Sequence, residues 1–154
     1  MTLSRHTDGA FDDELAALRA AVREIGAVAC AMVEDAARLL TAHDAAAAER
    51  VIEADRRLDA LRDALDERAV LTIARRQPVA VDLRAIVAAM RVAGALERVG
   101  DLAKNVAKRA GEIDGAGAPR EAAQAVQRMG RQAGRALAGA LQAWEAGDVA
   151  AAEA

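Results

Sequence analysis

Two pairs of acidic residues occur at four-residue spacing within long helical patterns. Glu97 precedes Asp101 in one segment, and Asp55 precedes Asp59 in another. Residues four apart share one face of a helix, so each pair places two like charges together at a cost of about 0.2–0.5 kcal/mol. Carboxylates gathered from two helices repel one another unless a cation or bound protons neutralise them. Oxygen ligands without nearby histidine or thiolate suit magnesium, manganese or iron, so the pattern predicts a site for divalent or iron-type metal ions.

A predicted helical hairpin around Pro78 brings the two acidic pairs to one level. The helices before and after Pro78 would run antiparallel, so residues equally far from the turn lie side by side. Asp55 and Asp101 are equally far from Pro78, and so are Asp59 and Glu97. Asp55 and Asp59 lie at the edge of the apolar face of their helix, and we therefore expect all four carboxylates to converge.

A second interpretation of these acids involves no metal. The carboxylates would then be solvated and would pair at the surface with basic residues of the same two helices. The candidate counterions are Arg56, Arg62, Arg98, Lys104 and Lys108. The residues alone leave the metal site and the surface ion pairs open.

A carboxylate-bridged metal enzyme is a third alternative, which the sequence disfavours. Di-iron enzymes built on helical bundles carry a Glu-x-x-His motif on two helices. Neither His6 nor His43 belongs to such a motif. The test of this alternative is substrate turnover that is lost in Glu97→Ala.

The elements that position these acids are long amphipathic helices, because apolar residues recur at steps of three and four. We predict helices over 11–43, 45–76 and 78–111, then a glycine-rich linker at 111–121 and a fourth helix ending at Gly147. Pro78 disfavours helix at the residue before it and so ends the second helix. The predicted core stripe of the third helix comprises Leu83, Ile86, Val87, Met90, Ala93 and Gly94, with Val92, Val99, Leu102 and Val106 on the opposite face.

Composition agrees with one all-α domain. With 154 residues, of which 54% are hydrophobic and only 1% aromatic, the chain can bury an alanine-rich helical core. A net charge of −3 and two aromatic residues argue against a nucleic-acid partner. No signal peptide and no run of about 18 apolar residues is present, so we expect a cytoplasmic protein without membrane insertion.

The fourth predicted helix resembles the first when the sequence is shifted by 104 positions. The matched pairs are Val22 with Val126, Ile25 with Met129, Gly26 with Gly130, Leu40 with Trp144, and Asp44 with Asp148. On this register residues 148–154 begin a second copy of residues 44–50. We therefore expect an antiparallel three-helix bundle at 1–114, followed at 115–154 by a linker and the first helix of a shortened second repeat.

Four segments carry a resemblance to the PhoU family of bacterial phosphate-uptake regulators. They read RHTDGAFDDEL, VIEADRRLDAL, RRQPVAVDLR and ALERVGDLAKNVA, and the last is the most specific. The resemblance implies tandem three-helix bundles in which Glu/Asp-x-x-x-Asp motifs bind metal ions, in some members iron or zinc. The matching positions here are Asp55 with Asp59 and Glu97 with Asp101, which favours the metal interpretation.

The same resemblance implies a function. Family members are non-enzymatic, cytoplasmic negative regulators of phosphate uptake, acting through contacts with the phosphate ABC transporter and the sensor histidine kinase of the phosphate regulon. The departure from the family is the shortened second repeat, which leaves one apolar helix face without partners. We therefore expect a homodimer or higher oligomer. The alternative function is a helical metal-binding oligomerisation module without regulatory activity.

Overall fold

The fold is a bundle of long helices, seen in a computed structural model that describes residues 9–42, 44–114 and 119–153. The helices are α1 (Gly9–Leu39), α2 (Ala45–Arg76), α3 (Ala80–Asp114), α4 (Arg120–Ala146) and the short α5 (Val149–Glu153). Over these residues the chain forms no strand, which confirms the predicted all-α class. Residues 1–8 and 115–118, with the start of the first motif and part of the predicted linker, lie outside the described residues, as does His43.

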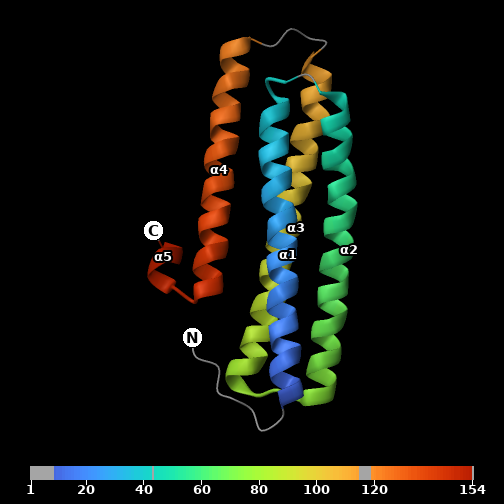
Figure 1. Cartoon of the computed structure of the whole chain (residues 1–154), viewed down its shortest axis with the longest axis vertical. Coiled ribbons are helices and arrows are strands. Elements are labelled where there is room, and N and C mark those ends of the chain that lie inside the picture. Colours follow the sequence, from blue (N-terminus) through green and yellow to red (C-terminus); the bar gives the residue numbers. More distant parts are fainter. Residues whose placement is uncertain (1–8, 43, 115–118, 154) are drawn as a thin grey trace.

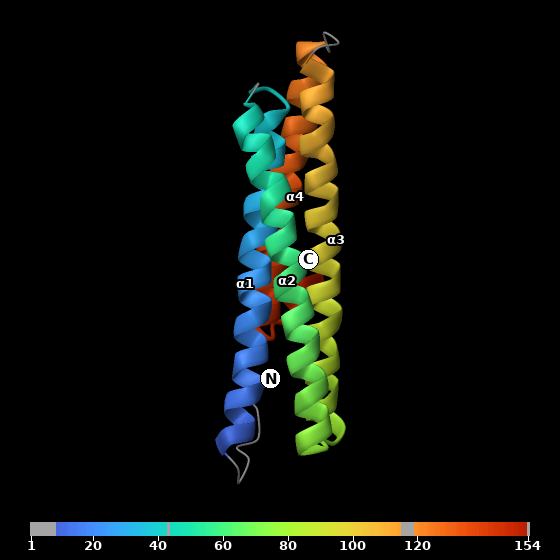
Figure 2. The same cartoon turned by 90° about the vertical axis from the view of Figure 1, so that its right-hand side faces the viewer.

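Helices α1, α2 and α3 form an antiparallel three-helix bundle, and α4 packs along the outside of α1 (Figure 1). The view turned by 90° shows α4 lying behind the three-helix bundle, with α2 in front (Figure 2). Among the described helices α4 contacts only α1 and α5. No helix in the described ranges is both long and apolar enough to cross a membrane.

The core lies between the first three helices and is built mainly from α1. Its largest fully buried side chains are Leu18, Val22, Ile25, Met32, Val51, Leu58, Leu65 and Ile86. The α3 side is lined mostly by alanine, whose small side chain allows helix axes to approach closely. Close approach brings the facing edges of α2 and α3 near each other, and the acidic residues lie on those edges.

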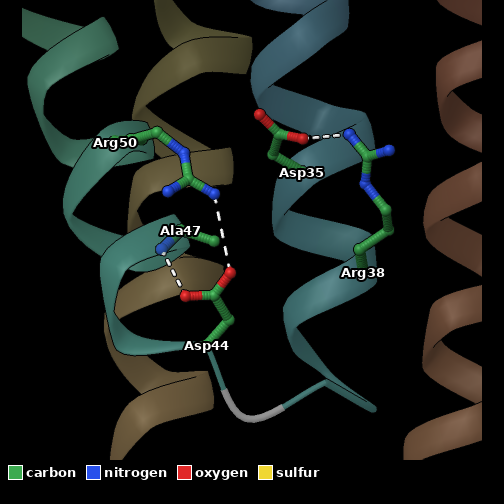
Figure 3. Close-up of polar contacts among 5 residues, drawn as sticks. All are labelled: Asp35, Arg38, Asp44, Ala47 and Arg50. Carbon is green, nitrogen blue, oxygen red and sulfur yellow. Dashed lines mark hydrogen bonds and ion pairs between the residues drawn. The ribbon is translucent and has the colours of Figure 1, made fainter.

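The turn between α1 and α2 is fixed by Asp44 (Figure 3). Its carboxylate accepts a hydrogen bond from the backbone N–H of Ala47 at 3.0 Å and lies 3.5 Å from the guanidinium of Arg50. Across the turn Arg38 pairs with Asp35 on α1. The N-cap bond satisfies one of the free N–H groups at the start of α2, and the predicted start at residue 45 is confirmed.

The hairpin between α2 and α3 has two residues in left-handed conformation. Gln77 caps α2 at a φ of 46°, and its N–H donates to the carbonyl of Ile73 at 3.0 Å. Ala80, also at a φ of 46°, is the first residue of α3. The predicted end of the second helix at residue 76 is confirmed, whereas the third helix begins after Pro78 and runs on to Asp114.

The predicted core face of the third helix was partly wrong. Leu83 is 37% exposed, and Leu102 of the supposed opposite face is 59% exposed. The buried stripe lies between the two predicted faces and continues unbroken along the helix: Ile86, Ala89, Ala93, Leu96, Gly100, Ala103, Ala107 and Ala110. Large residues flank this stripe on both edges because alanines leave room for the neighbouring helices at its centre. The acids therefore lie on one edge of a continuous face, and the core does not change sides.

Candidate functional site

The candidate site lies between α2 and α3, around a buried carboxylate. Asp55 of α2 is 4% exposed, and the only other buried polar or charged residue in the described part of the chain is Thr72. Lys104 of α3 donates to Oδ2 of Asp55 from its Nζ at 2.6 Å. The same Nζ donates to Oδ1 of Asp101 at 2.6 Å. One ammonium group therefore joins carboxylates of two helices.

A glycine on α3 allows the two helices to come this close. Gly100 is buried, and a Cβ at this position would lie 3.1 Å from Cδ2 of Leu58 and 3.5 Å from Cε of Met32. Leu58 lies between the two aspartates of α2, and Gly100 directly precedes Asp101. The missing side chain thus sets the distance between the acidic edges of the two helices.

Charges from both helices also act on Asp59, which is exposed. Partial desolvation of its carboxyl by the neighbouring helices, and then the negative charges of Asp55 and Asp101, raise the pKa of Asp59, while Lys104 opposes the shift. The pKa of Asp101 is lowered, chiefly by the hydrogen bond from Lys104 and also by Glu97 and Arg98. The charge of Asp101 on α3 thus affects the pKa of Asp59 on α2.

Of the four predicted residues, Asp55 and Asp101 are joined through Lys104, as their equal distances from Pro78 indicate. Asp55 lies in the core as predicted, but Asp59 is exposed rather than near the core. Glu97 is half-buried beside Asp101 and contributes to the electrostatic environment of Arg62.

Two of the arginines that the surface-pairing interpretation named as counterions take other partners. Arg56 bonds Glu53 at 2.8 Å, and Arg62 bonds Asp63 at 2.6 Å. The residue missed as a member of the site is Lys104, which the sequence suggested only as a solvated counterion. Its position three residues after Asp101, on the same face, was the available signal.

The carboxylate oxygens of these four acids are the kind of ligand that a hard cation prefers. Oδ1 of Asp55 is buried and has no hydrogen-bond partner, so one anionic oxygen remains for a further ligand. In the present arrangement, however, no three His, Cys, Asp or Glu side chains of the described residues are placed to hold a metal ion. The ammonium of Lys104 lies between the carboxylates of Asp55 and Asp101 instead. A metal ion would be held by Asp55, Asp59, Glu97 and Asp101 only after that ammonium had moved.

Fold and site together define a helical-bundle protein with a carboxylate cluster between its second and third helices. Comparison with known proteins gives the family. The model of the PhoU domain matches residues 22–110, a range that includes the whole cluster. The chain therefore belongs to the PhoU family.

Two curated relatives carry the name phosphate-specific transport system accessory protein PhoU homolog. The protein from Rhizobium meliloti is 44% identical over 124 residues, which are 80% of this chain and 52% of the relative. The protein from Caulobacter vibrioides is 36% identical over 147 residues, which are 96% of this chain and 64% of the relative. This chain thus spans between half and two thirds of these relatives.

A solved structure shares the fold. The crystal structure of PhoU from Pseudomonas aeruginosa superposes with a TM-score of 0.87 at 32% sequence identity. The match covers 92% of this chain and 68% of the Pseudomonas chain. The likeness therefore extends over α4 as well as the three-helix bundle.

Proposed function

We propose that this chain is a cytoplasmic negative regulator of phosphate uptake and of phosphate-regulon signalling. It acts without catalysis, by contacts with the phosphate ABC transporter and the phosphate-sensing histidine kinase. The observation that carries the proposal is the family match over residues 22–110, together with relatives named as accessory proteins of a phosphate-specific transport system.

The test is a phosphate-regulon reporter in cells that lack their own family member. With phosphate plentiful, the reporter is active in such cells, and this chain supplied in trans should restore repression. Asp101→Asn tests the cluster, and Glu112→Gln is the matched control, because Glu112 is an exposed acid on the same helix. High reporter activity despite visible expression of the wild-type chain would overturn the proposal.

The second part of the proposal is that the cluster binds a divalent or iron-type cation through Asp55, Asp59, Glu97 and Asp101. Its support is the unpartnered buried oxygen of Asp55, together with the pKa of Asp59, which is raised first by desolvation of its carboxyl and then by the negative charge of Asp55. Titration of the metal-free protein with Mn²⁺ by calorimetry tests it. Asp55→Asn should weaken binding at least tenfold, whereas Asp63→Asn, one turn beyond Asp59, should change it little.

The alternative function is a helical metal-binding oligomerisation module without regulatory activity. It is favoured by the exposure of apolar residues on α4, where Met129 is 67% exposed. Metal binding and self-association without repression of the reporter would select this function over regulation.

A further inference from the structure

Among the described residues, the ammonium of Lys104 is the only cation that directly contacts Asp55, the buried acid of the cluster. Its Nζ is 2.6 Å from Oδ2 of Asp55 and 2.6 Å from Oδ1 of Asp101. The Lys104 side chain is 21% exposed, whereas that of Asp55 is 6% exposed. The lysine thus reaches from the bundle surface inward and places its charge between the two helices.

That position is the one a bridging metal ion would need. Metal ions with oxygen ligands lie about 2.0–2.6 Å from carboxylate oxygens, so an ion joining Asp55 to Asp101 would overlap the ammonium group. A metal ion bound to these same two oxygens, Oδ2 of Asp55 and Oδ1 of Asp101, and the ammonium of Lys104 would therefore exclude each other. A lysine side chain has a flexible four-carbon stem, and Lys104 is close enough to solvent to swing outward.

The lysine supplies one positive charge to four acids. Its Nζ donates hydrogen bonds to the carboxylates of both Asp101 and Asp55. The buried Oδ1 of Asp55 still lacks a partner. The ammonium of Lys104 thus joins two of the four carboxylates and leaves one oxygen of Asp55 without a partner.

We propose that Lys104 is a built-in cation that holds the metal position in the Asp55–Asp101 cluster, so that a metal ion binds only by displacing it. This inference rests on the proposed cation site. It makes metal occupancy optional for folding and sets the metal concentration at which the site fills. Removing the lysine charge should therefore have opposite effects on metal-free stability and on metal affinity.

The experiment compares Lys104→Met with Lys108→Met, an exposed lysine one turn further along the same helix. In buffer freed of metal, Lys104→Met should lower the Tm by roughly 5 °C, because it leaves the carboxylate of Asp55 buried without a partner. The same variant should bind Mn²⁺ at least tenfold more tightly than the wild-type chain in a calorimetric titration. Lys108→Met should match the wild-type chain in both measurements.

Three outcomes are distinguishable. Tighter Mn²⁺ binding in Lys104→Met alone supports the inference. Equal or weaker Mn²⁺ binding in a folded Lys104→Met, with the wild-type chain binding, overturns it while leaving the cation site standing. Absence of Mn²⁺ binding in every protein overturns both the inference and the proposed site. If circular dichroism shows Lys104→Met unfolded, Lys104→Gln, whose neutral amide can still donate to one carboxylate, is held to the same criteria.

Discussion

Asp55 shows why the acidic residues of this protein are more than a solvated helix face. Burying an ionised carboxylate is costly unless it is paired and hydrogen-bonded. Asp55 is 4% exposed and uses only one of its two oxygens for its bond to Lys104. A purely structural ion pair could have been built at the surface at lower cost. The cost is explained if the site has a second cationic ligand.

Asp59 provides a test of charge repulsion within the cluster. Its carboxylate is repelled by Asp55 and Asp101 in the metal-free protein. Asp59→Asn should therefore raise the free energy of unfolding, by less than about 1 kcal/mol because the residue is exposed. Urea denaturation in metal-free buffer at neutral pH measures the change.

The control for Asp59 is Asp63→Asn on the same helix. Asp63 bonds Arg62 at 2.6 Å with its side chain 71% exposed, so its neutralisation should not stabilise the protein. A gain in Asp63→Asn equal to that in Asp59→Asn would mean that general negative charge, rather than the cluster, destabilises the bundle.

Glu14 makes the stability of the bundle depend on pH in the acid range. Arg76 donates to Glu14 from Nη2 at 2.8 Å and from Nε at 3.3 Å, joining the start of α1 to the end of α2. This hydrogen bond lowers the pKa of Glu14 below its ordinary value of 4.5. The ionised form thus favours folding, so the stabilisation is present above pH 4.5 and is lost as the pH falls through the lowered pKa.

Glu14→Gln should consequently lower the Tm at pH 7, and its deficit should shrink as the pH falls below about 4.5. Thermal melts followed by circular dichroism from pH 7 to pH 3 measure this difference. Glu24→Gln is the control, since Glu24 bonds Arg57 at 3.0 Å with both side chains at least half exposed, and its effect should be small. If the Tm of Glu14→Gln were lowered by the same amount at every pH, Glu14 would stabilise the bundle by packing rather than by its charge.

At the residue scale the sequence predicted that Asp55 and Asp101 lie at one level, but it did not predict that Lys104 joins them. Helical spacing and distance from Pro78 determine the level at which carboxylates meet, and both can be read from residue positions. The direction in which Lys104 points depends on how deeply Asp55 is buried and how closely Gly100 lets the helices approach. Burial depth and helix approach both depend on tertiary packing, so the sequence predicted Lys104 only as a nearby counterion.

At the scale of elements, the packing of α1 on α4 agrees with the internal repeat. A Cβ on Gly26 would meet Cδ1 of Leu141 at 2.8 Å, and a Cβ on Gly130 would meet Cβ of Ala37 at 2.7 Å. On the repeat register Gly26 corresponds to Gly130, and Leu141 corresponds to Ala37. The second contact is therefore the repeat equivalent of the first, because each helix places its glycine against the same repeat position of the other helix.

The helix N-caps repeat on the same register. Asp148 accepts from the N–H of Ala151 at 3.0 Å, as Asp44 accepts from that of Ala47 at 3.0 Å. The short α5 thus starts as α2 starts, which agrees with the predicted second copy of residues 44–50. The repeat could be predicted because caps and close-packed glycines are local signals. The core face of α3 was harder to predict, because in an alanine-rich helix the buried and exposed faces differ little in hydrophobicity.

The glycines at the α1–α4 crossing should respond differently to substitution. Gly130→Ala forces its new methyl against the rigid Ala37, so it should lower the free energy of unfolding by about 1–2 kcal/mol, overpacking outweighing the gain in helix propensity. Gly26→Ala should be nearly neutral, because the end of the Leu141 side chain can move aside.

Gly94 is the matched control for helix propensity alone. A Cβ there meets nothing within 4 Å, so Gly94→Ala should stabilise the protein by about 0.5–1 kcal/mol. Chemical denaturation of the three variants gives the comparison. Stabilisation by Gly130→Ala as large as that by Gly94→Ala would show that α4 does not sit closely on α1.

At the scale of the molecule, the repeat leaves one helix face uncovered. Val22 and Ile25 of α1 are fully buried against α2 and α3, but their counterparts on α4, Val126 and Met129, are 45% and 67% exposed. The face that forms the core in the first repeat thus lies at the surface in the second. The chain spans 52% and 64% of the two relatives described above.

We expect this face of α4 to be covered by the same face of a second copy, because two identical apolar faces can close symmetrically about a twofold axis. Sedimentation equilibrium over a wide range of concentrations should show the 16.0 kDa chain associating. Met129→Lys should shift the equilibrium toward monomer, since the charge would be buried without a partner. Leu102→Lys, which changes an apolar residue of α3 that is 59% exposed, should leave it unchanged. A wild-type chain that stays monomeric at every concentration would contradict the expectation, and equal effects of the two lysines would assign association to general hydrophobicity rather than to α4.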